Sequence, residues 1–339
     1  MPQPPAHQPP TVSDKENANM PRILITSTSF GKRVKGPLET LLAKGYDLKF
    51  NDLGRPLSPE ELIERLADCD GCIAGLDYFT AEVFAAAEKL RIVSRYGSGV
   101  DRVDLDAAAR AGVTVTNTPV ANSDSVADLA VGLMLAVARK IPLADRSVRQ
   151  GQWKNMYGVS LSGKTVGLLG FGRIGRRVAD RVQGFGCRVL VHDPFIDPKT
   201  TEQCGVEAAT LEKVLAEADF ISLHLPANDE TRAMINAEKF RLMKPSAILV
   251  NTARGETVDQ DALLEALRGG RIGGAGLDVH CVEPPDPALF DGMDNVVLTP
   301  HMGAYTQESL VNMAAGSVDN LCAFFAGKEP PCVVVKGSR

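Results

Sequence analysis

The sequence has no uncharged apolar run of 18 or more residues, no excess of positive charge and no basic start followed by an apolar segment. The first absence excludes a transmembrane helix, and the last argues against a secretory signal. The formal net charge is −5, which gives no reason to expect nucleic acid or an anionic membrane as a partner. We therefore expect a cytoplasmic protein with small-molecule partners.

The seven cysteines are scattered, and Cys69 and Cys72 form the one close pair. Neither a second cysteine pair nor a His-x-x-His motif accompanies them, as a zinc site would require. We therefore predict no metal site and expect reduced thiols, as in cytosolic proteins.

What the sequence does contain is enough apolar material for two cores. Its 339 residues, 44% of them apolar, predict two globular domains. Residues 1–18 are rich in proline and almost free of large apolar side chains, so residues 1–20 are predicted to be a disordered tail. The folded part is expected to begin at Pro21, before the strand-like run 22–26.

Strand-like and helix-like segments alternate from there on. Strands are predicted at 22–26, 72–75, 90–94 and 113–117, and helices at 38–44, 59–67 and 82–89. This order favours a parallel sheet covered by helices on both faces. Residues 123–139 form a helix that is apolar nearly all round, so a domain junction or a subunit interface is expected to bury it.

A second alternating series runs from Lys164 to about His301, and a last helix is predicted at 306–325. We expect this helix to pack back on the first domain, which makes that domain discontinuous. The prediction is thus an α/β protein with two doubly wound domains, residues 21–118 with 306–335 and residues 119–305.

A dinucleotide-binding fingerprint begins the second series. Gly170, Gly172 and Gly175 follow the strand 164–169 directly, a helix is predicted at 176–185, and Asp193 ends the next strand. The glycines permit a tight turn, a close approach of the pyrophosphate and close packing of helix on strand. A carboxylate at Asp193 can accept hydrogen bonds from ribose hydroxyls and repels a 2′-phosphate, which favours NAD over NADP.

Three later strands are each followed by a residue whose side chain can take part in catalysis: Arg254, Glu283 and His301. Ligands of doubly wound folds lie at the carboxyl ends of the strands, so these residues are expected to converge. Hydride transfer from an alcohol carbon needs a base, and histidine suits neutral pH. Glu283 can orient His301, and Arg254 can hold a substrate carboxylate. His224 and His280 are interpreted as structural.

At this point the sequence resembles the D-isomer-specific 2-hydroxyacid dehydrogenases, most of all their phosphoglycerate dehydrogenase branch. The resemblance rests on several segments in family order: 95–104 (RYGSGVDRVD), 117–119 (NTP), 125–128 (SVAD), 161–175 (LSGKTVGLLGFGRIG), 192–194 (HDP), 250–255 (VNTARG), 277–279 (LDV), 283–285 (EPP) and 299–304 (TPHMGA).

The resemblance implies a role for each matching residue. Arg254, Glu283 and His301 fall on the family's catalytic residues. The implied cofactor-binding residues are Gly170, Gly172, Arg173, Ile174, Gly175, Asp193, Leu225, Pro226, Thr252, Ala253, Asp278 and Gly303. The implied substrate-binding residues are Tyr96, Gly97, Ser98 and Gly99, whose loop amides hold the carboxylate, together with Arg254 and His301. The resemblance also implies a Rossmann-like fold, NAD as cofactor and a homodimer formed through the region of residues 123–139.

The identity of the 2-hydroxyacid, or of the corresponding 2-oxoacid, stays open. Phosphoglycerate-specific members often carry an Arg-Ser pair where this chain reads IAGLDY, residues 73–78. This departure weakens the expectation of a phosphorylated substrate, although Arg95, Lys32 or Arg33 could substitute. Tyr96 and Ser98 also replace a more frequent alanine and threonine.

Two alternatives remain at this stage. The first is an NAD(H)-sensing binding protein similar to the C-terminal-binding co-repressors, which keep the same three residues. The second is a phosphite-type dehydrogenase of the same fold. Formate dehydrogenases of this fold pair their histidine with glutamine, so Glu283 argues against that activity.

Overall fold

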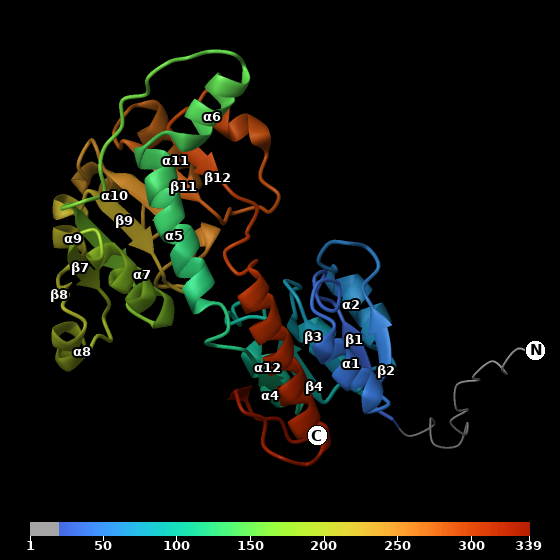
Figure 1. The fold of residues 1–339 in the computed structure, drawn as a ribbon. Helices are drawn as coiled ribbons and strands as arrows, with labels where there is room; N and C mark the ends of the chain where they lie inside the picture. The colour runs from blue at the N-terminus through green and yellow to red at the C-terminus, as the bar shows by residue number, and fades with distance from the viewer. Residues whose placement is uncertain (1–19) are drawn as a thin grey trace, which may run out of the picture. The chain divides into compact units, whose positions relative to one another are not determined.

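The computed structural model describes residues 20–339, which form two compact units (Figure 1). Unit 1 contains the described residues up to Pro119 together with Leu310–Arg339, and unit 2 contains Val120–Ser309. The predicted tail, residues 1–20, lies outside the described residues except for Met20. Among the described residues, no helix is both long and apolar enough to cross a bilayer.

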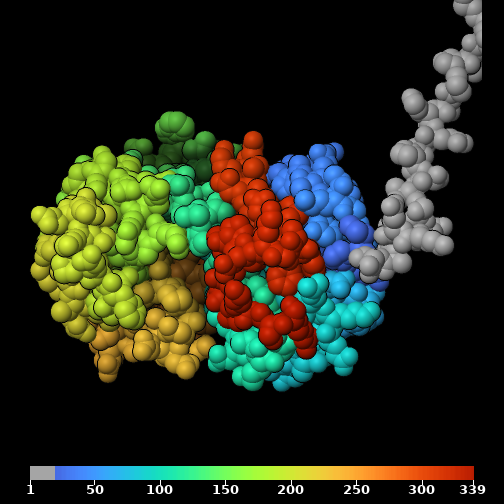
Figure 2. Space-filling view, turned by 90° about the horizontal axis from the view of Figure 1, so that it is seen from below, coloured from blue at the N-terminus to red at the C-terminus, as the bar shows by residue number. Residues whose placement is uncertain are grey.

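Unit 1 is built on a sheet of six strands in the order β13-β5-β4-β3-β1-β2. Its elements are β1 (Arg22–Ile25), α1 (Gly36–Ala43), β2 (Asp47–Phe50), α2 (Pro59–Leu66), β3 (Gly71–Ala74), α3 (Ala81–Ala86), β4 (Ile92–Arg95), α4 (Leu105–Arg110), β5 (Thr114–Thr116), α12 (Gln307–Phe325) from Leu310 onward, and β13 (Val333–Val335). β13 pairs antiparallel with β5, whereas the other pairs are parallel. Figure 2 shows the red C-terminal segment lying against cyan residues of this unit.

Apolar side chains cover both faces of this sheet. Leu62, Leu66 and Phe84 belong to the cluster on the α2, α3 and α4 side, and Val318 and Leu321 of α12 belong to the cluster on the other side. The chain segment after residue 309 therefore completes the core begun by β1–β5. Burial on both faces is what parallel sheets require, and it explains the apolar runs of β1 and β3.

Unit 2 is built on a parallel sheet of seven strands in the order β12-β11-β10-β9-β6-β7-β8. Its elements are α5 (Ser123–Ala138), α6 (Ile141–Arg149), β6 (Thr165–Leu169), α7 (Arg173–Gln183), β7 (Arg188–His192), α8 (Pro198–Gln203), β8 (Glu207–Ala208), α9 (Leu211–Glu217), β9 (Phe220–Leu223), α10 (Ala237–Leu242), β10 (Ile248–Asn251), η2 (Gly255–Thr257), α11 (Gln260–Arg268), β11 (Gly274–Leu277), η3 (Pro287–Phe290) and β12 (Val296–Leu298). The chain order reverses between β6 and β9, where doubly wound folds open a crevice for ligands.

The helix α5 is buried within unit 2 itself. It packs beside α7 on one face of the sheet (Figure 1), where Ala127, Ala130 and Met134 join the same apolar cluster as Val178 and Val250. Burial of this apolar helix therefore requires neither a domain junction nor a partner subunit. The opposite face is covered by α9, α10 and α11.

The segment 73–78 is held by one buried carboxylate. Asp77 is 1% exposed, and its oxygens accept the backbone N–H groups of Leu57 at 2.7 Å and Gly75 at 3.1 Å. The hydroxyl of Thr26 donates to the same carboxylate. Asp77 thus ties the loop after β3 to the loops after β1 and β2.

We predict that Asp77→Ala lowers the free energy of unfolding by about 2–4 kcal/mol, because two buried amides lose their acceptor. The exposed Asp47, which pairs with Arg22, provides the control, since Asp47→Ala should cost no more than about 1 kcal/mol. Urea denaturation measures both. Equal losses in the two variants would contradict the role given to Asp77.

Candidate active site

The glycine turn after β6 is required by close backbone packing. Gly170 has φ +94°, and a Cβ there would lie 2.5 Å from the carbonyl oxygen of His224. A Cβ at Gly175 would lie 2.3 Å from the carbonyl oxygen of Gly170. A Cβ at Gly172, in contrast, would meet no atom within 4 Å. Two glycines therefore serve the packing of turn, strand and helix, and the third leaves open space at the start of α7.

The helix α7 begins at Arg173, so the prediction that it begins at residue 176 was wrong. Gly172 is its N-cap in extended conformation, and the Arg176 N–H donates to the Gly172 carbonyl at 3.1 Å. Gly175 lies in the first turn because only glycine fits against Gly170. The backbone N–H groups of Arg173 and Ile174 consequently lie at the helix start, where anionic groups are favoured.

Asp193 follows β7 and is fixed by two backbone amides. One carboxylate oxygen accepts the N–H of Phe171 at 2.7 Å, and the other accepts the N–H of Phe195 at 2.9 Å. The first bond joins Asp193 directly to the glycine turn. Because a carboxylate oxygen has more than one lone pair, Asp193 can accept further hydrogen bonds.

The other predicted residues of unit 2 also follow its parallel strands. Leu225 and Pro226 come after β9, the segment Thr252-Ala253-Arg254 after β10, Asp278 and Glu283 after β11, and His301 and Gly303 after β12. Since all these strands are parallel, their carboxyl ends share one edge of the sheet with the glycine turn.

Glu283 and His301 form a hydrogen-bonded pair. The His301 Nδ1 lies 2.9 Å from one carboxylate oxygen of Glu283 and 3.0 Å from the other. Both side chains are partly exposed, His301 by 25% and Glu283 by 21%. An ionised carboxylate only accepts, so the proton is assigned to Nδ1, and Nε2 remains for another partner.

The loop that carries His301 is organised by Asp278, a function that the sequence analysis did not foresee. Asp278 is 1% exposed and accepts the Thr299 hydroxyl at 2.6 Å, the Met302 N–H at 2.8 Å and the Gly303 N–H at 2.8 Å. The His301 N–H donates to the Asp278 carbonyl at 2.9 Å. These bonds hold His301 at φ +50°, a conformation that few non-glycine residues adopt.

Arg254 lies in a loop whose backbone is fixed on both sides. Its carbonyl accepts the side chains of Asn251 at 2.8 Å and Thr257 at 2.7 Å, and its guanidinium donates to the Ala253 carbonyl at 2.6 Å. The buried Asn251 and Thr257 are therefore supporting residues that the sequence analysis missed. A buried polar residue at a strand end was the available signal.

The loops of Arg254 and Glu283 are in direct backbone contact at Gly255. A Cβ on Gly255 would lie 2.1 Å from the carbonyl carbon of His280 and 2.4 Å from the nitrogen of Cys281. The His280 N–H in turn faces Glu283 Oε1 at 3.3 Å. Gly255 thus sets the distance between the segment that carries Arg254 and the segment that carries Glu283.

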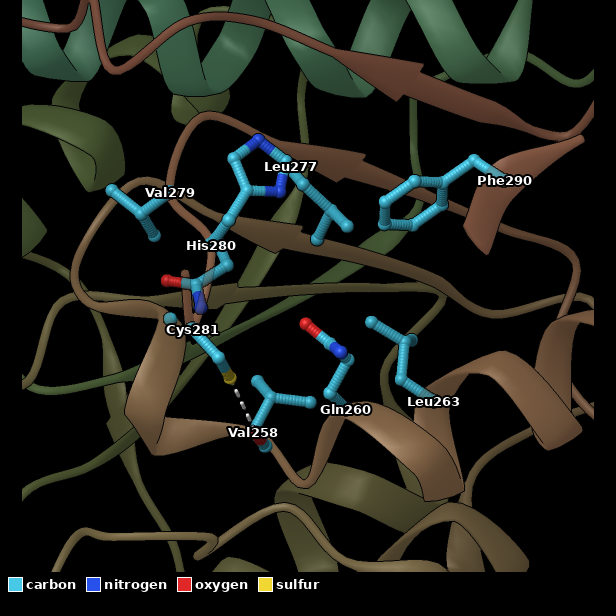
Figure 3. Close-up of a pocket in the computed structure, with 10 residues that line it drawn as sticks. Val258, Gln260, Leu263, Leu277, Val279, His280, Cys281 and Phe290 are labelled. Atoms are coloured by element: carbon cyan, nitrogen blue, oxygen red, sulfur yellow. Dashed lines mark hydrogen bonds between the residues drawn. The ribbon is translucent and has the colours of Figure 1, made fainter. Parts of the chain in front are cut away.

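A small cavity lies under this contact (Figure 3). Its volume is about 20 Å³, and it is lined on one side by the edge-to-face pair of His280 and Phe290. The Cys281 thiol lies 3.9 Å from the Val258 carbonyl, and burial raises the pKa of this thiol. The cavity is too small for a substrate or cofactor and is separate from the Glu283–His301 pair, because neither residue lines it.

The residues Tyr96, Gly97, Ser98 and Gly99 lie in unit 1, directly after β4. Gly97 has φ +143°, and its N–H donates to the Thr118 hydroxyl at 3.1 Å. Arg95 is 4% exposed and donates to the carbonyls of Gly99 at 3.0 Å and Ala74 at 2.8 Å. The loop is thus held from within, and the amide of Gly97 is already engaged.

In the described part of the chain, no three His, Cys, Asp or Glu side chains gather as metal ligands would. The seven cysteines are free thiols, of which Cys69, Cys72 and Cys187 are buried.

We predict that Gly255→Ala destabilises the protein by about 1–3 kcal/mol, because the new methyl group meets rigid backbone. Gly132→Ala is the matched control. Gly132 lies on the exposed side of α5 with no atom near its Cβ position, so alanine there should raise the free energy of unfolding by about 0.5–1 kcal/mol. Denaturant midpoints measure both, and a Gly255→Ala protein as stable as the parent would disprove the contact.

Comparison with known proteins gives a consistent result. A sequence model of the D-isomer specific 2-hydroxyacid dehydrogenase NAD-binding domain matches residues 131–303. A glyoxylate reductase from Korarchaeum cryptofilum is 46% identical over 288 residues, which cover 82% of this chain and 86% of that protein. The human D-3-phosphoglycerate dehydrogenase is 47% identical over 257 residues, 75% of this chain but only 48% of that protein.

A solved structure from Thermus thermophilus superposes with a TM-score of 0.84 at 40% identity, covering 93% of this chain and all of that one. The fold, the NAD-binding motif and these relatives agree. The chain belongs to the D-isomer-specific 2-hydroxyacid dehydrogenase family and is an NAD-dependent oxidoreductase.

Proposed function

We propose that this protein reduces a small, unphosphorylated 2-oxoacid such as glyoxylate, with Arg254, Glu283 and His301 as its catalytic residues. The observation that carries the proposal is the Glu283–His301 pair, with both carboxylate oxygens within 3.0 Å of Nδ1. It lies at the sheet edge that also carries the glycine turn and Asp193.

The cofactor site fits a dinucleotide on structural grounds. Gly172 leaves open space at the start of α7, and the first-turn amides of Arg173 and Ile174 suit a pyrophosphate. The hydroxyl of Thr252 is buried without a partner among the described residues. NADH, when bound, supplies the hydride for the reduction, and Asp193 favours it over NADPH by charge.

His301 is the proton donor in this proposal. Glu283 fixes the imidazole with its proton on Nδ1 and stabilises the ring when it is doubly protonated. Nε2 then gives its proton to the oxygen of the substrate carbonyl, and in the reverse direction it accepts the alcohol proton. Glu283 itself only orients and stabilises, as the carboxylate of a catalytic triad does.

Arg254 binds the 2-oxoacid through its guanidinium, which stays charged at every working pH. The fixed backbone of its loop limits the directions in which the side chain can reach. We further propose that the amides of Ser98 and Gly99 bind the substrate carboxylate. Gly97 is left out of this set because its N–H already donates to Thr118.

The preference for an unphosphorylated substrate rests on unit 1. Segment 73–78 carries no basic side chain, and its Asp77 is buried and hydrogen-bonded. Of the three substitutes considered, Arg95 is buried and donates to two backbone carbonyls, whereas Lys32 and Arg33 are exposed. The similarity to a glyoxylate reductase supports the same choice, because it covers 86% of that protein, whereas the phosphoglycerate dehydrogenase relative is matched over 48% of its length.

The first test follows NADH oxidation with glyoxylate and with phosphohydroxypyruvate. We expect kcat/KM for glyoxylate to exceed that for the phosphorylated acid by at least about tenfold, since segment 73–78 itself contains no basic side chain and Arg95 is engaged with backbone carbonyls. A preference for phosphohydroxypyruvate would refute the substrate proposal but leave the catalytic residues standing.

The second test concerns the proton donor. His301→Ala should lower kcat for glyoxylate by about 10²–10⁴-fold, because the substrate oxygen loses its acid. The Kd of NADH, measured by fluorescence, should stay within about twofold of the parent value, which shows that the site remains folded. A variant with near-parental kcat would rule His301 out.

We also propose that the protein is a homodimer. The resemblance implies a homodimer through the region of residues 123–139, and the arm that follows this region, formed by α6 and residues 150–160, carries unusually exposed apolar side chains. Trp153 is 89% and Tyr157 90% exposed, and Ile141 and Val148 are more than half exposed. Aromatic side chains on such an arm are typical of buried interface positions.

The double variant Trp153→Ala/Tyr157→Ala should sediment as a monomer in analytical ultracentrifugation, whereas the parent sediments as a dimer. Phe195→Ala is the matched control, since Phe195 is equally exposed in unit 2 but lies after β7, and it should leave the dimer intact. A monomeric parent protein would contradict the proposal.

A further inference from the structure

His224 directly follows β9, beside the point where the strand order reverses. Its N–H donates to the Leu169 carbonyl at 2.7 Å. Its carbonyl oxygen would lie only 2.5 Å from a Cβ on Gly170. The backbone of His224 therefore packs directly against the glycine turn. The sequence analysis interpreted this histidine as structural only.

The imidazole of His224 has an unusual environment. Both ring nitrogens are buried, and neither has a hydrogen-bond partner among the described residues. Buried polar atoms are nearly always paired, because an unpaired one keeps the cost of desolvation without compensation. A histidine with two such atoms is a poor choice for a purely structural position, where an apolar side chain would pack as well.

Two further buried hydroxyls without a described partner, those of Ser222 and Thr252, belong to β9 and to the segment directly after β10. Parallel pairing places Val250 beside Ser222 and Asn251 beside Leu223, and His224 and Thr252 directly follow this last pair. Side chains alternate along strands, and the His224 N–H continues the pairing of β9 with β6, so Ser222 and His224 share one face. It is the face of α5 and α7, because Phe220 and Val250 join that cluster.

The charge state of the His224 imidazole limits the kind of chemical group that it can bind. Burial lowers the pKa of His224 to about 3, so the imidazole is uncharged at neutral pH. One nitrogen then donates and the other accepts. Such a ring suits a neutral hydroxyl or amide group rather than a phosphate, which the helix start of α7 already serves.

We propose that His224 is a cofactor-binding residue: its imidazole hydrogen-bonds a neutral polar group of the bound dinucleotide, at the strand ends that also carry the buried hydroxyl of Thr252. The unpaired nitrogens then lower the stability of the cofactor-free protein and raise its affinity for NAD(H). The inference rests on the proposed cofactor site at this sheet edge.

The test compares full-length variants in two measurements, the Kd of NADH by fluorescence and the Tm without cofactor. His224→Leu should weaken NADH binding about 5–10-fold, as the loss of one hydrogen bond does. It should also raise the Tm without cofactor by about 2–4 °C, because the unpaired nitrogens are gone. His224→Asn, which keeps one donor and one acceptor, should bind NADH more tightly than His224→Leu.

Ser222→Ala is the matched control, since it removes a buried unpaired hydroxyl two residues earlier on the same face. It should leave the Kd of NADH unchanged. A His224→Leu protein with the parental Kd would overturn the proposal, and so would a weaker Kd accompanied by a lower Tm, which indicates loss of packing. If His224→Leu does not fold, a His224→Asn protein that binds NADH more than tenfold more weakly than the parent would overturn it as well.

Asp193→Ala separates this inference from the proposed cofactor site. A weaker Kd in Asp193→Ala together with a parental Kd in His224→Leu would leave the site standing and remove His224 from it. An unchanged Kd in both variants would overturn the site and the inference together.

Discussion

The arrangement of the candidate active site depends on the carboxylate of Asp278. It is almost fully buried at the end of β11, and it collects the Thr299 hydroxyl and the amides of Met302 and Gly303. These bonds turn the chain after β12 so that His301, at positive φ, faces Glu283. Without this acceptor, three donors would lose their partner, the buried Gly303 N–H among them, and the loop would have no reason to keep its strained conformation.

A second constraint acts on the other side of Glu283. Gly255 allows the backbone of the Arg254 loop to touch the backbone at His280 and Cys281. The three proposed catalytic residues are therefore positioned by contacts between loops, each of which begins at a strand of one parallel sheet. The sheet brings the loops to one edge, and a carboxylate and a glycine set their final spacing.

Much of this architecture could be predicted from local sequence. The apolar runs of β1, β3, β6 and β7 and the glycine fingerprint are local signals. The later runs of β10, β11 and β12 are local signals too, and they identified Arg254, Glu283 and His301 as strand-end residues. The edge strand β2 was missed because it is polar, and the helices α4 and α6 were missed because they are too short to show a clear apolar repeat. The start of α7 was placed three residues too late, because the sequence alone does not show that Gly175 packs against Gly170 in the first turn of this helix.

Tertiary contacts that carry no local signature could not be predicted. The hydrogen bonds of Asp278, the contact at Gly255 and the engagement of the Gly97 amide by Thr118 join segments distant in sequence. The unpaired imidazole of His224 belongs to the same class. Residues that break local rules of packing and pairing tend to mark functional positions, and His224 and Thr252 are two such residues directly after β9 and β10.

The central claim is that Glu283 and His301 act as one unit on the substrate. A double-mutant cycle on kcat/KM for glyoxylate, with Glu283→Gln, His301→Gln and the double variant, tests it most directly. If Glu283 works through His301, the double variant is within about threefold of His301→Gln, because the second change has nothing left to remove. If the two losses multiply instead, each residue acts independently on the substrate, and the account of the pair is wrong.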